Sequence, residues 1–281
     1  MTDTVLAGPP VLTSTSGRGY AAAFWGLVVR DLVVLRRQGA MFFVRTVMQP
    51  FLIAFVFAYV FPRIGQGFGG DVAAASGYGT ILLPGLIAFT TMFQGVSAVA
   101  LPLVDEFNTS HEIEDRAMAP LPTSFLALQK IVFGAFQALL AAVVVFPCVW
   151  LVARDVTSLH VNNWLQLAAI LLLACFGSAA LGLLLGTVFV PRTVPLVFSL
   201  IVVPVMFLGC TYYPWKSLEV IRWLQLLVLL NPLVYVSEGL RGALTPQVPH
   251  MSPWVTFGAL LAATLALGIA GTITFRRRLL S

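Results

Sequence analysis

The sequence predicts an all-α integral membrane protein with six transmembrane helices, an amphipathic helix before the first of them and a re-entrant external hairpin before the last. Of its 281 residues 59% are hydrophobic and only 10% are charged, and the mean hydropathy is +0.95. A soluble domain could not cover its surface with so few polar residues. Six apolar segments of spanning length and an uneven distribution of basic residues complete the prediction, so lipid is the expected solvent for most of the surface.

Each predicted span is long enough to cross a membrane. A hydrocarbon core of about 30 Å requires roughly 20 apolar residues in a helix that rises about 1.5 Å per residue. Pro84, Pro147 and Pro204 fall inside predicted spans, where a membrane helix tolerates a kink. The predicted spans are residues 44–61, 81–104, 125–152, 165–190, 195–212 and 254–275.

Small residues recur along one face of the fourth predicted span. Ser178, Gly182 and Gly186 follow one another at four-residue spacing, so they lie on the same side of a helix. Small side chains let the backbones of two helices approach closely in a membrane. We therefore expect this face to pack against another helix.

A shorter apolar run, residues 223–236, predicts the re-entrant hairpin, which extends over residues 213–245. Its 14 residues are too few to cross, and Asn231 and Pro232 interrupt them. The distribution of basic residues agrees, because a seventh crossing would move Arg276, Arg277 and Arg278 away from the other cationic residues. With six crossings the side of the N-terminus holds Arg18, Arg30, Arg36, Arg37, Arg45, Arg116, Lys130, Arg192, Arg276, Arg277 and Arg278, and the other side only Arg63, Arg154, Lys216, Arg222 and Arg241.

Residues 1–43 are predicted to form a cytoplasmic tail and an amphipathic helix, and residues 44–281 the membrane domain. The first 19 residues contain no apolar core of signal-peptide length. In residues 24–38 one apolar face is expected opposite Arg30 and Arg37, although Leu27 and Val34 interrupt the polar side. Such a helix can lie at the headgroup boundary or contact a cytoplasmic partner. The apolar face consists of Phe24, Trp25, Val28, Val29, Leu32 and Leu35.

The predicted spans lack the side chains that ion coupling or catalysis would require. Lys130, near one end, is the only ionisable residue in the second to sixth spans, whereas a proton- or ion-coupled carrier keeps such groups at membrane depth. His111, His160 and His250 are isolated, no phosphate-binding GxxxxGK[ST] loop is present, and the three cysteines have no paired spacing. The basic residues form no stripe with aromatics, as a nucleic-acid site would need. We expect no enzyme active site, metal or cofactor in this chain.

Polar residues gather instead in the predicted cytoplasmic loop at residues 105–123. Acidic residues and Arg116 alternate there with Ile113, Ala117 and Met118, and prolines close the segment. A short helix of this kind could offer ion pairs and an apolar contact to another protein. A simple solvated loop is the other interpretation. The loop contains Asp105, Glu106, Glu112, Glu114, Asp115 and Arg116.

Three stretches are distinctive in combination. They are Glu112, Ile113, Glu114, Asp115 and Arg116 followed by residues 119–122; Tyr212, Tyr213 and Pro214; and Asn231, Pro232, Leu233, Val234 and Tyr235 followed by Leu240 and Arg241. With them, nearly the whole chain resembles the type-2 ATP-binding-cassette (ABC) exporter permeases, in particular the drug-resistance and antibiotic-efflux permeases of the daunorubicin-resistance type.

The resemblance implies partners and roles. Two permease chains, as a homodimer or heterodimer, would pair with two separate ABC ATPase subunits that bind ATP and Mg. Residues 112–116 would form the coupling helix that contacts the ATPase, and residues 24–38, with Phe24, Arg30 and Arg37, the interface helix. The protein would lie in a bacterial plasma membrane with both termini cytoplasmic. The external gate would consist of Tyr212, Tyr213, Pro214, Asn231, Pro232 and Arg241.

The route of the substrate is open at this stage. Aromatic, Met and polar side chains in the spans could form a path for an amphipathic drug, antibiotic or lipid, or could simply face lipid or pack between helices. Export of lipid-linked polysaccharide, a stand-alone channel or carrier, and a membrane enzyme or anchor are the other functions considered. The candidate path residues are Phe89, Phe93, Gln94, Phe198, Met206 and Phe207.

Overall fold

The computed structural model describes residues 17–37, 39–60, 72–108, 123–153, 161, 163–189, 193, 196, 200 and 202–279. All regular structure in these ranges is helical. The elements are α1 (Gly17–Arg37), α2 (Gly39–Ala54) with its π-helical continuation η1 (Phe55–Val60), α4 (Val72–Asn108), α6 (Thr123–Ala153), α7 (Trp164–Val188), α9 (Val203–Phe207), η3 (Trp215–Val220), α10 (Arg222–Leu227), η4 (Val228–Leu230), α11 (Pro232–Leu244) and α12 (Pro253–Leu279).

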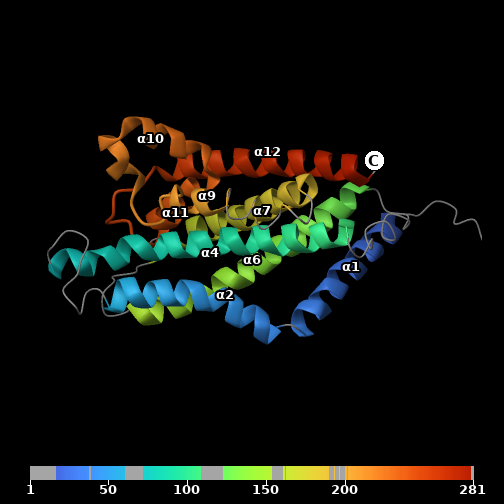
Figure 1. Cartoon of the computed structure of the whole chain (residues 1–281), viewed down its shortest axis with the longest axis horizontal. Coiled ribbons are helices and arrows are strands. Elements are labelled where there is room, and N and C mark those ends of the chain that lie inside the picture. The colour runs from blue at the N-terminus through green and yellow to red at the C-terminus, as the bar shows by residue number, and fades with distance from the viewer. Residues whose placement is uncertain are drawn as a thin grey trace, which may run out of the picture.

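Four helices are long and apolar enough to cross a membrane, and they correspond to the second, third, fourth and sixth predicted spans. They are Thr80–Phe107 within α4, Thr123–Cys148 within α6, α7 and α12. Two further segments pass the same test only as bent pairs, so the described chain has four to six candidate spans. The long helices run roughly along the long axis of the molecule (Figure 1).

The first and fifth predicted spans are less regular. Residues 44–60 are helical in α2 and η1, and α2 begins earlier than expected, at Gly39. In the described part of residues 195–212, α9 covers only Val203–Phe207, and turns follow it. Six crossings therefore stay a prediction.

Close packing joins α4 to α7, as the small residues of the fourth span predict. A Cβ atom added to Gly182 would lie 2.7 Å from the carbonyl oxygen of Val96, and one added to Gly186 would lie 3.0 Å from Cα of Ala100. At Gly95 an added Cβ would lie 2.0 Å from Oγ of Ser178. Glycine is therefore required where the two backbones approach.

Prolines lie inside the long helices without ending them. Pro84 and Pro102 fall within α4, Pro147 within α6 and Pro50 within α2. Neighbouring helices can satisfy the backbone groups that a proline frees in a membrane protein. The prediction that Pro84 and Pro147 are tolerated inside spans is confirmed.

Helix α1 contacts the bundle partly through residues outside its predicted apolar face. Leu27 packs against the core that α4, α6, α7 and α12 share, and Asp31 on the same side is only partly exposed. Trp25 and Val29 from the predicted apolar face are 64% and 52% exposed. The axes of Phe24–Arg37 and Phe42–Phe57 differ by 81°. Leu27, which interrupts the predicted polar side, thus belongs to the protein-facing side.

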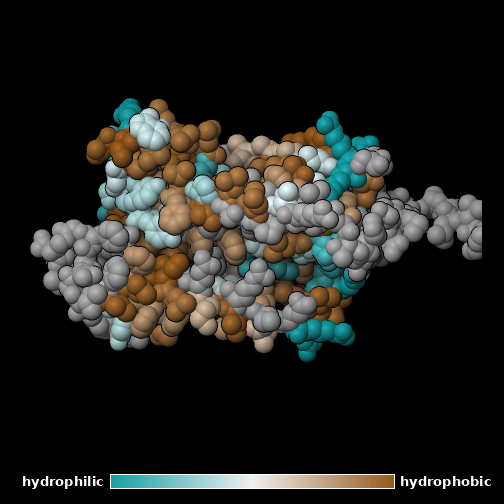
Figure 2. All heavy atoms as spheres, viewed as in Figure 1, coloured by the Kyte–Doolittle hydropathy of each residue, from teal (hydrophilic) through white to brown (hydrophobic). Residues whose placement is uncertain are grey.

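The surface of the molecule is polar mainly at one end. Hydrophilic residues gather near α1 and the last turn of α12, at the right of the view, whereas hydrophobic residues cover much of the middle and of α10 (Figure 2). The last turn of α12 contains Arg276, Arg277 and Arg278. The basic end and the α10–α11 end are therefore opposite ends of the bundle.

Candidate functional site

Helices α10 and α11 form a sharply bent pair in the region predicted as the hairpin. Arg222–Leu230 and Pro232–Leu244 meet at 98°, and the break lies at Asn231. The side chain of Asn231 accepts a hydrogen bond from N–H of Leu233 at 3.0 Å and donates one to the carbonyl oxygen of Val205 at 2.5 Å. Proline at the first position of α11 fits a helix start, because an N–H at that position would have no partner within the helix and proline lacks one. The interruption that Asn231 and Pro232 predict is confirmed.

Arg241 lies inside the protein rather than at its surface. Its side chain is fully buried and forms an ion pair with Glu238, one turn earlier in α11. Its Nη2 atom donates hydrogen bonds to the carbonyl oxygens of Cys210, at 3.0 Å, and of Ile81, at 3.3 Å. The guanidinium thus links α11 to α4 and to the turn after α9.

Glu238 links two further segments. Its Oε1 atom accepts a hydrogen bond from N–H of Trp215 at 2.9 Å, and its Oε2 atom accepts one from N–H of Met251 at 3.0 Å. Trp215 begins η3, and Met251 precedes α12. The Glu238–Arg241 pair therefore connects α11 with four segments that are distant in the sequence.

Glu238 was not among the predicted site residues. The signal was present, because Glu238 is the only acidic residue in α11 and stands three positions before Arg241, on the same face of the helix. Taking two charges out of water is costly unless they are paired and hydrogen-bonded, and this pair meets both conditions except at Nε of Arg241, which has no hydrogen-bond partner among the described residues. A buried pair of this kind specifies geometry more than it adds stability.

The Tyr212–Tyr213–Pro214 segment connects α9 to the hairpin. The hydroxyl of Tyr213 donates to the carbonyl oxygen of Phe207 at 3.1 Å, and the rings of Tyr212 and Phe207 stack with centroids 5.9 Å apart. Pro214 is buried and precedes η3. The structure thus places all six predicted gate residues in one continuous region around the hairpin.

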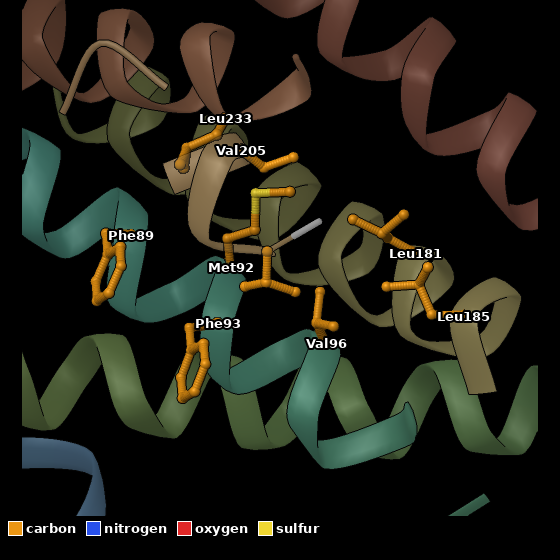
Figure 3. A pocket seen from close by; sticks show the side chains of 9 residues that line it. Phe89, Met92, Phe93, Val96, Leu181, Leu185, Val205 and Leu233 are labelled. Carbon is orange, nitrogen blue, oxygen red and sulfur yellow. The ribbon is translucent and has the colours of Figure 1, made fainter. Parts of the chain in front are cut away.

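A small apolar pocket lies beside the start of α11. About 320 Å³ of empty space, part of it open to the surroundings, separates side chains of α4, α7, α9 and α11 (Figure 3). The part of it that a water-sized molecule can occupy is only about 20 Å³, far below the roughly 300–1,000 Å³ of a pocket that holds a drug-sized ligand. Every lining side chain is apolar. The lining consists of Phe89, Met92, Phe93, Val96, Leu181, Leu185, Val202, Val205 and Leu233.

The candidate path residues occupy different places. Phe89 and Phe93 line the pocket, with their rings stacked at a centroid distance of 6.2 Å. Gln94 instead accepts a hydrogen bond from Thr46 of α2 at 3.5 Å, and Phe207 is 61% exposed beside Tyr212. Phe198 and the side chain of Met206 lie outside the described residues.

The predicted docking helix at Glu112–Arg116 also lies outside the described residues, whereas residues 105–108 continue α4 instead of beginning a loop.

In the part of the chain that the structure describes, no three His, Cys, Asp or Glu side chains gather as metal ligands would. Cys175 and Cys210 are buried and Cys148 is partly buried, all three as free thiols.

A family model described as ABC-2 type transporter matches residues 22–245, from α1 to the end of α11. No curated protein matches the sequence.

Proposed function

The chain belongs to the ABC-2 type transporter family, and from this premise we propose that it is the permease subunit through which an ATP-driven complex exports a hydrophobic or amphipathic substrate. Family membership makes it a multi-pass membrane protein and the transmembrane subunit of an ABC transporter, a family whose permeases normally pair with ABC ATPase subunits. The proposal adds the direction of transport, the substrate class and the roles of the residues described above.

The position of Leu233 carries the proposal. Leu233 lies in the first turn of α11 and forms part of the pocket wall, and its N–H is bonded to Asn231 at the break of the hairpin. Any movement of α11 relative to α4 and α7 would therefore change the pocket. The hairpin acts as a gate next to a site for apolar groups.

The character of the pocket lining favours a drug, an antibiotic or a lipid as substrate. Its side chains are aromatic, aliphatic or thioether groups, which bind apolar surface and offer no donor or acceptor for the hydroxyl groups of a sugar. The polysaccharide part of a lipid-linked polysaccharide would find no partner there. The pocket must widen to admit a drug-sized molecule, and movement of the hairpin supplies a means to do so.

The proposed topology has six spans, with the basic end of the bundle in the cytoplasm of a bacterial cell. Helix α1 and Arg276–Arg278 of α12 lie toward this end, and the hairpin lies at the other (Figure 1). The positive-inside rule then places the hairpin outside and both termini inside. Exposed Arg30 and Arg37 of α1 would contact anionic headgroups beside the ATPase.

The coupling role of residues 112–116 completes the proposal. Two ATPase subunits, which hold ATP and Mg, would each receive this segment from one of two permease chains. Because the chain itself supplies no phosphate-binding loop, the energy for transport comes from these partners.

Purification of the tagged chain from its native membranes tests this function. A roughly equimolar ABC ATPase is expected to co-purify, and neutralising the docking segment with Glu112→Gln, Glu114→Gln and Asp115→Asn is expected to release most of it. The matched control neutralises three acidic residues on the predicted external side, Asp71→Asn, Asp155→Asn and Glu219→Gln, and should retain the ATPase. Neutralisation leaves the distribution of positive charge, and hence the topology, unchanged. A chain that purifies without any ATPase would refute the function.

A further inference from the structure

A buried ion pair joins α4 to α6 next to the predicted docking segment. Nζ of Lys130 donates to Oε1 of Glu106 at 2.5 Å, and the two side chains are only 11% and 12% exposed. Glu106 lies in the last turn of α4, which ends at Asn108, and Lys130 lies near the start of α6, which begins at Thr123. The ion pair thus links α4 and α6, the two helices that precede and follow residues 109–122 in the sequence.

A second polar contact extends this link to α1. Nε2 of Gln129, the residue before Lys130, donates to Oδ2 of Asp31 at 2.7 Å. Gln129 is 1% exposed and therefore lies in the protein interior. Two adjacent residues of α6 thus bind α4 on one side and α1 on the other.

A third contact holds the end of α12 to the same region. Nη1 of Arg278 donates to the carbonyl oxygens of Thr187, at 2.8 Å, and Phe189, at 2.9 Å, and so caps the end of α7. The guanidinium carbon lies 4.7 Å from the centre of the Phe107 ring, next to Glu106 in α4. The basic end of the bundle is therefore cross-linked by polar groups, whereas the core between the long helices is formed by apolar side chains.

The position of these groups suggests a mechanical role. Two helices that are held together only by apolar contacts can slide or separate when a force acts on the segment between them. A buried ion pair resists separation, because parting the charges would leave each of them desolvated without a partner. Such a pair stabilises one relative position of α4 and α6.

We propose that Glu106 and Lys130 are positioning residues that make α4 and α6 move as one unit when the ATPase acts on residues 112–116, with Asp31 and Gln129 adding α1 to that unit. The inference rests on the proposed function. A displacement at the docking segment then reaches the opposite end of the bundle along α6 rather than being lost by separation of the two helices.

The test measures movement at the far end of α6 in the intact complex with its ATPase, reconstituted in lipid nanodiscs. Spin labels are placed at Leu151→Cys of α6 and Val255→Cys of α12, both exposed, in a chain whose three native cysteines are replaced by alanine. The distance between the labels is measured by pulsed electron paramagnetic resonance without nucleotide and after trapping with ATP and vanadate. This readout requires no knowledge of the transported substrate.

Three variants define the role of the pair. Glu106→Leu with Lys130→Leu removes both charges, so neither is left buried without the other, and the chain is expected to fold and retain the ATPase while the nucleotide-dependent shift is lost. Glu106→Lys with Lys130→Glu restores the attraction and is expected to restore the shift. Asp105→Asn, at an exposed carboxylate beside Glu106, is the matched control and should behave like the parent chain.

Each outcome has one meaning. A double leucine variant that keeps the full shift would overturn the inference, and so would a charge-swapped variant that behaves like the double leucine variant, because the attraction between the two groups would then not matter. A parent complex that binds the ATPase but shows no shift would overturn the inference as well, whereas a parent chain that binds no ATPase contradicts the proposed function itself.

Discussion

The guanidinium of Arg241 donates a hydrogen bond to the carbonyl oxygen of Cys210, 3.0 Å away. Cys210 has a φ angle of 53°, in the left-handed region that residues with a side chain rarely adopt. The buried charge in α11 therefore helps to hold a strained turn at the end of α9. The hairpin and the turn that leads into it are one structural unit.

Replacing Arg241 with methionine should destabilise the protein strongly. Removing one partner leaves the Glu238 carboxylate buried without its counter-charge, which typically costs about 3–5 kcal/mol. Thermal unfolding of the purified chain in detergent measures the effect. Arg222→Met in α10 removes an exposed arginine and is the matched control, with an expected change within about 0.5 kcal/mol.

A double variant separates the pair from its surroundings. Glu238→Leu with Arg241→Leu should destabilise less than the sum of the single variants Glu238→Leu and Arg241→Leu, because neither charge is then left alone. Some destabilisation remains, since N–H of Trp215 and of Met251 lose their acceptor. Strictly additive losses would show that the two charges are not coupled.

Gly182→Ala should weaken the contact between α4 and α7. The new methyl group would lie 2.7 Å from the carbonyl oxygen of Val96, so a backbone must move, at a cost of about 1–3 kcal/mol. Gly268→Ala in α12 is the control, because an added Cβ there would lie within 4 Å of no atom outside its own stretch of helix. This variant should be neutral or slightly stabilising because alanine favours helix. Unfolding temperatures compare the two, and equal values would argue against the close approach.

Labelling tests whether the hairpin returns to the side from which it starts. Gln247, between α11 and α12, is exposed, so Gln247→Cys should react from outside the cell with a maleimide that cannot cross membranes. Arg277→Cys, at the basic end, should react only after the membrane is opened. Asn231 is a poorer position for a label because its side chain is buried and caps α11. Reaction of position 247 only from the cytoplasm would require an additional crossing.

Filling the pocket should slow export without affecting assembly. Leu181→Phe adds bulk to the lining from α7, and we expect a several-fold slower ATP-dependent transport of ethidium, a hydrophobic cation, into inside-out vesicles. Leu172→Phe adds the same bulk on an exposed position of α7 and should transport like the parent chain. The amount of co-purifying ATPase serves as the measure of assembly for both. Equal slowing by the two variants would show that the pocket is not the route.

Local patterns predicted much of this structure. The lengths of the apolar segments predicted the four long helices, the Asn231–Pro232 pair predicted the break between η4 and α11, and the spacing of Ser178, Gly182 and Gly186 predicted the close contact with α4. Each of these properties depends on a few neighbouring residues, because helix formation, capping and the absence of a side chain act locally.

The sequence by itself therefore determined the class of the protein, its main helices and the position of the break before α11. Only the tertiary structure decided that Glu238 and Arg241 are buried together, that Leu27 and Asp31 define the protein-facing side of α1, and that Glu106 meets Lys130. Ile81 and Arg241, for example, are 160 positions apart yet share a hydrogen bond. Whether a charge faces lipid, water or a partner depends on helices distant in the sequence, and no local pattern contains that information.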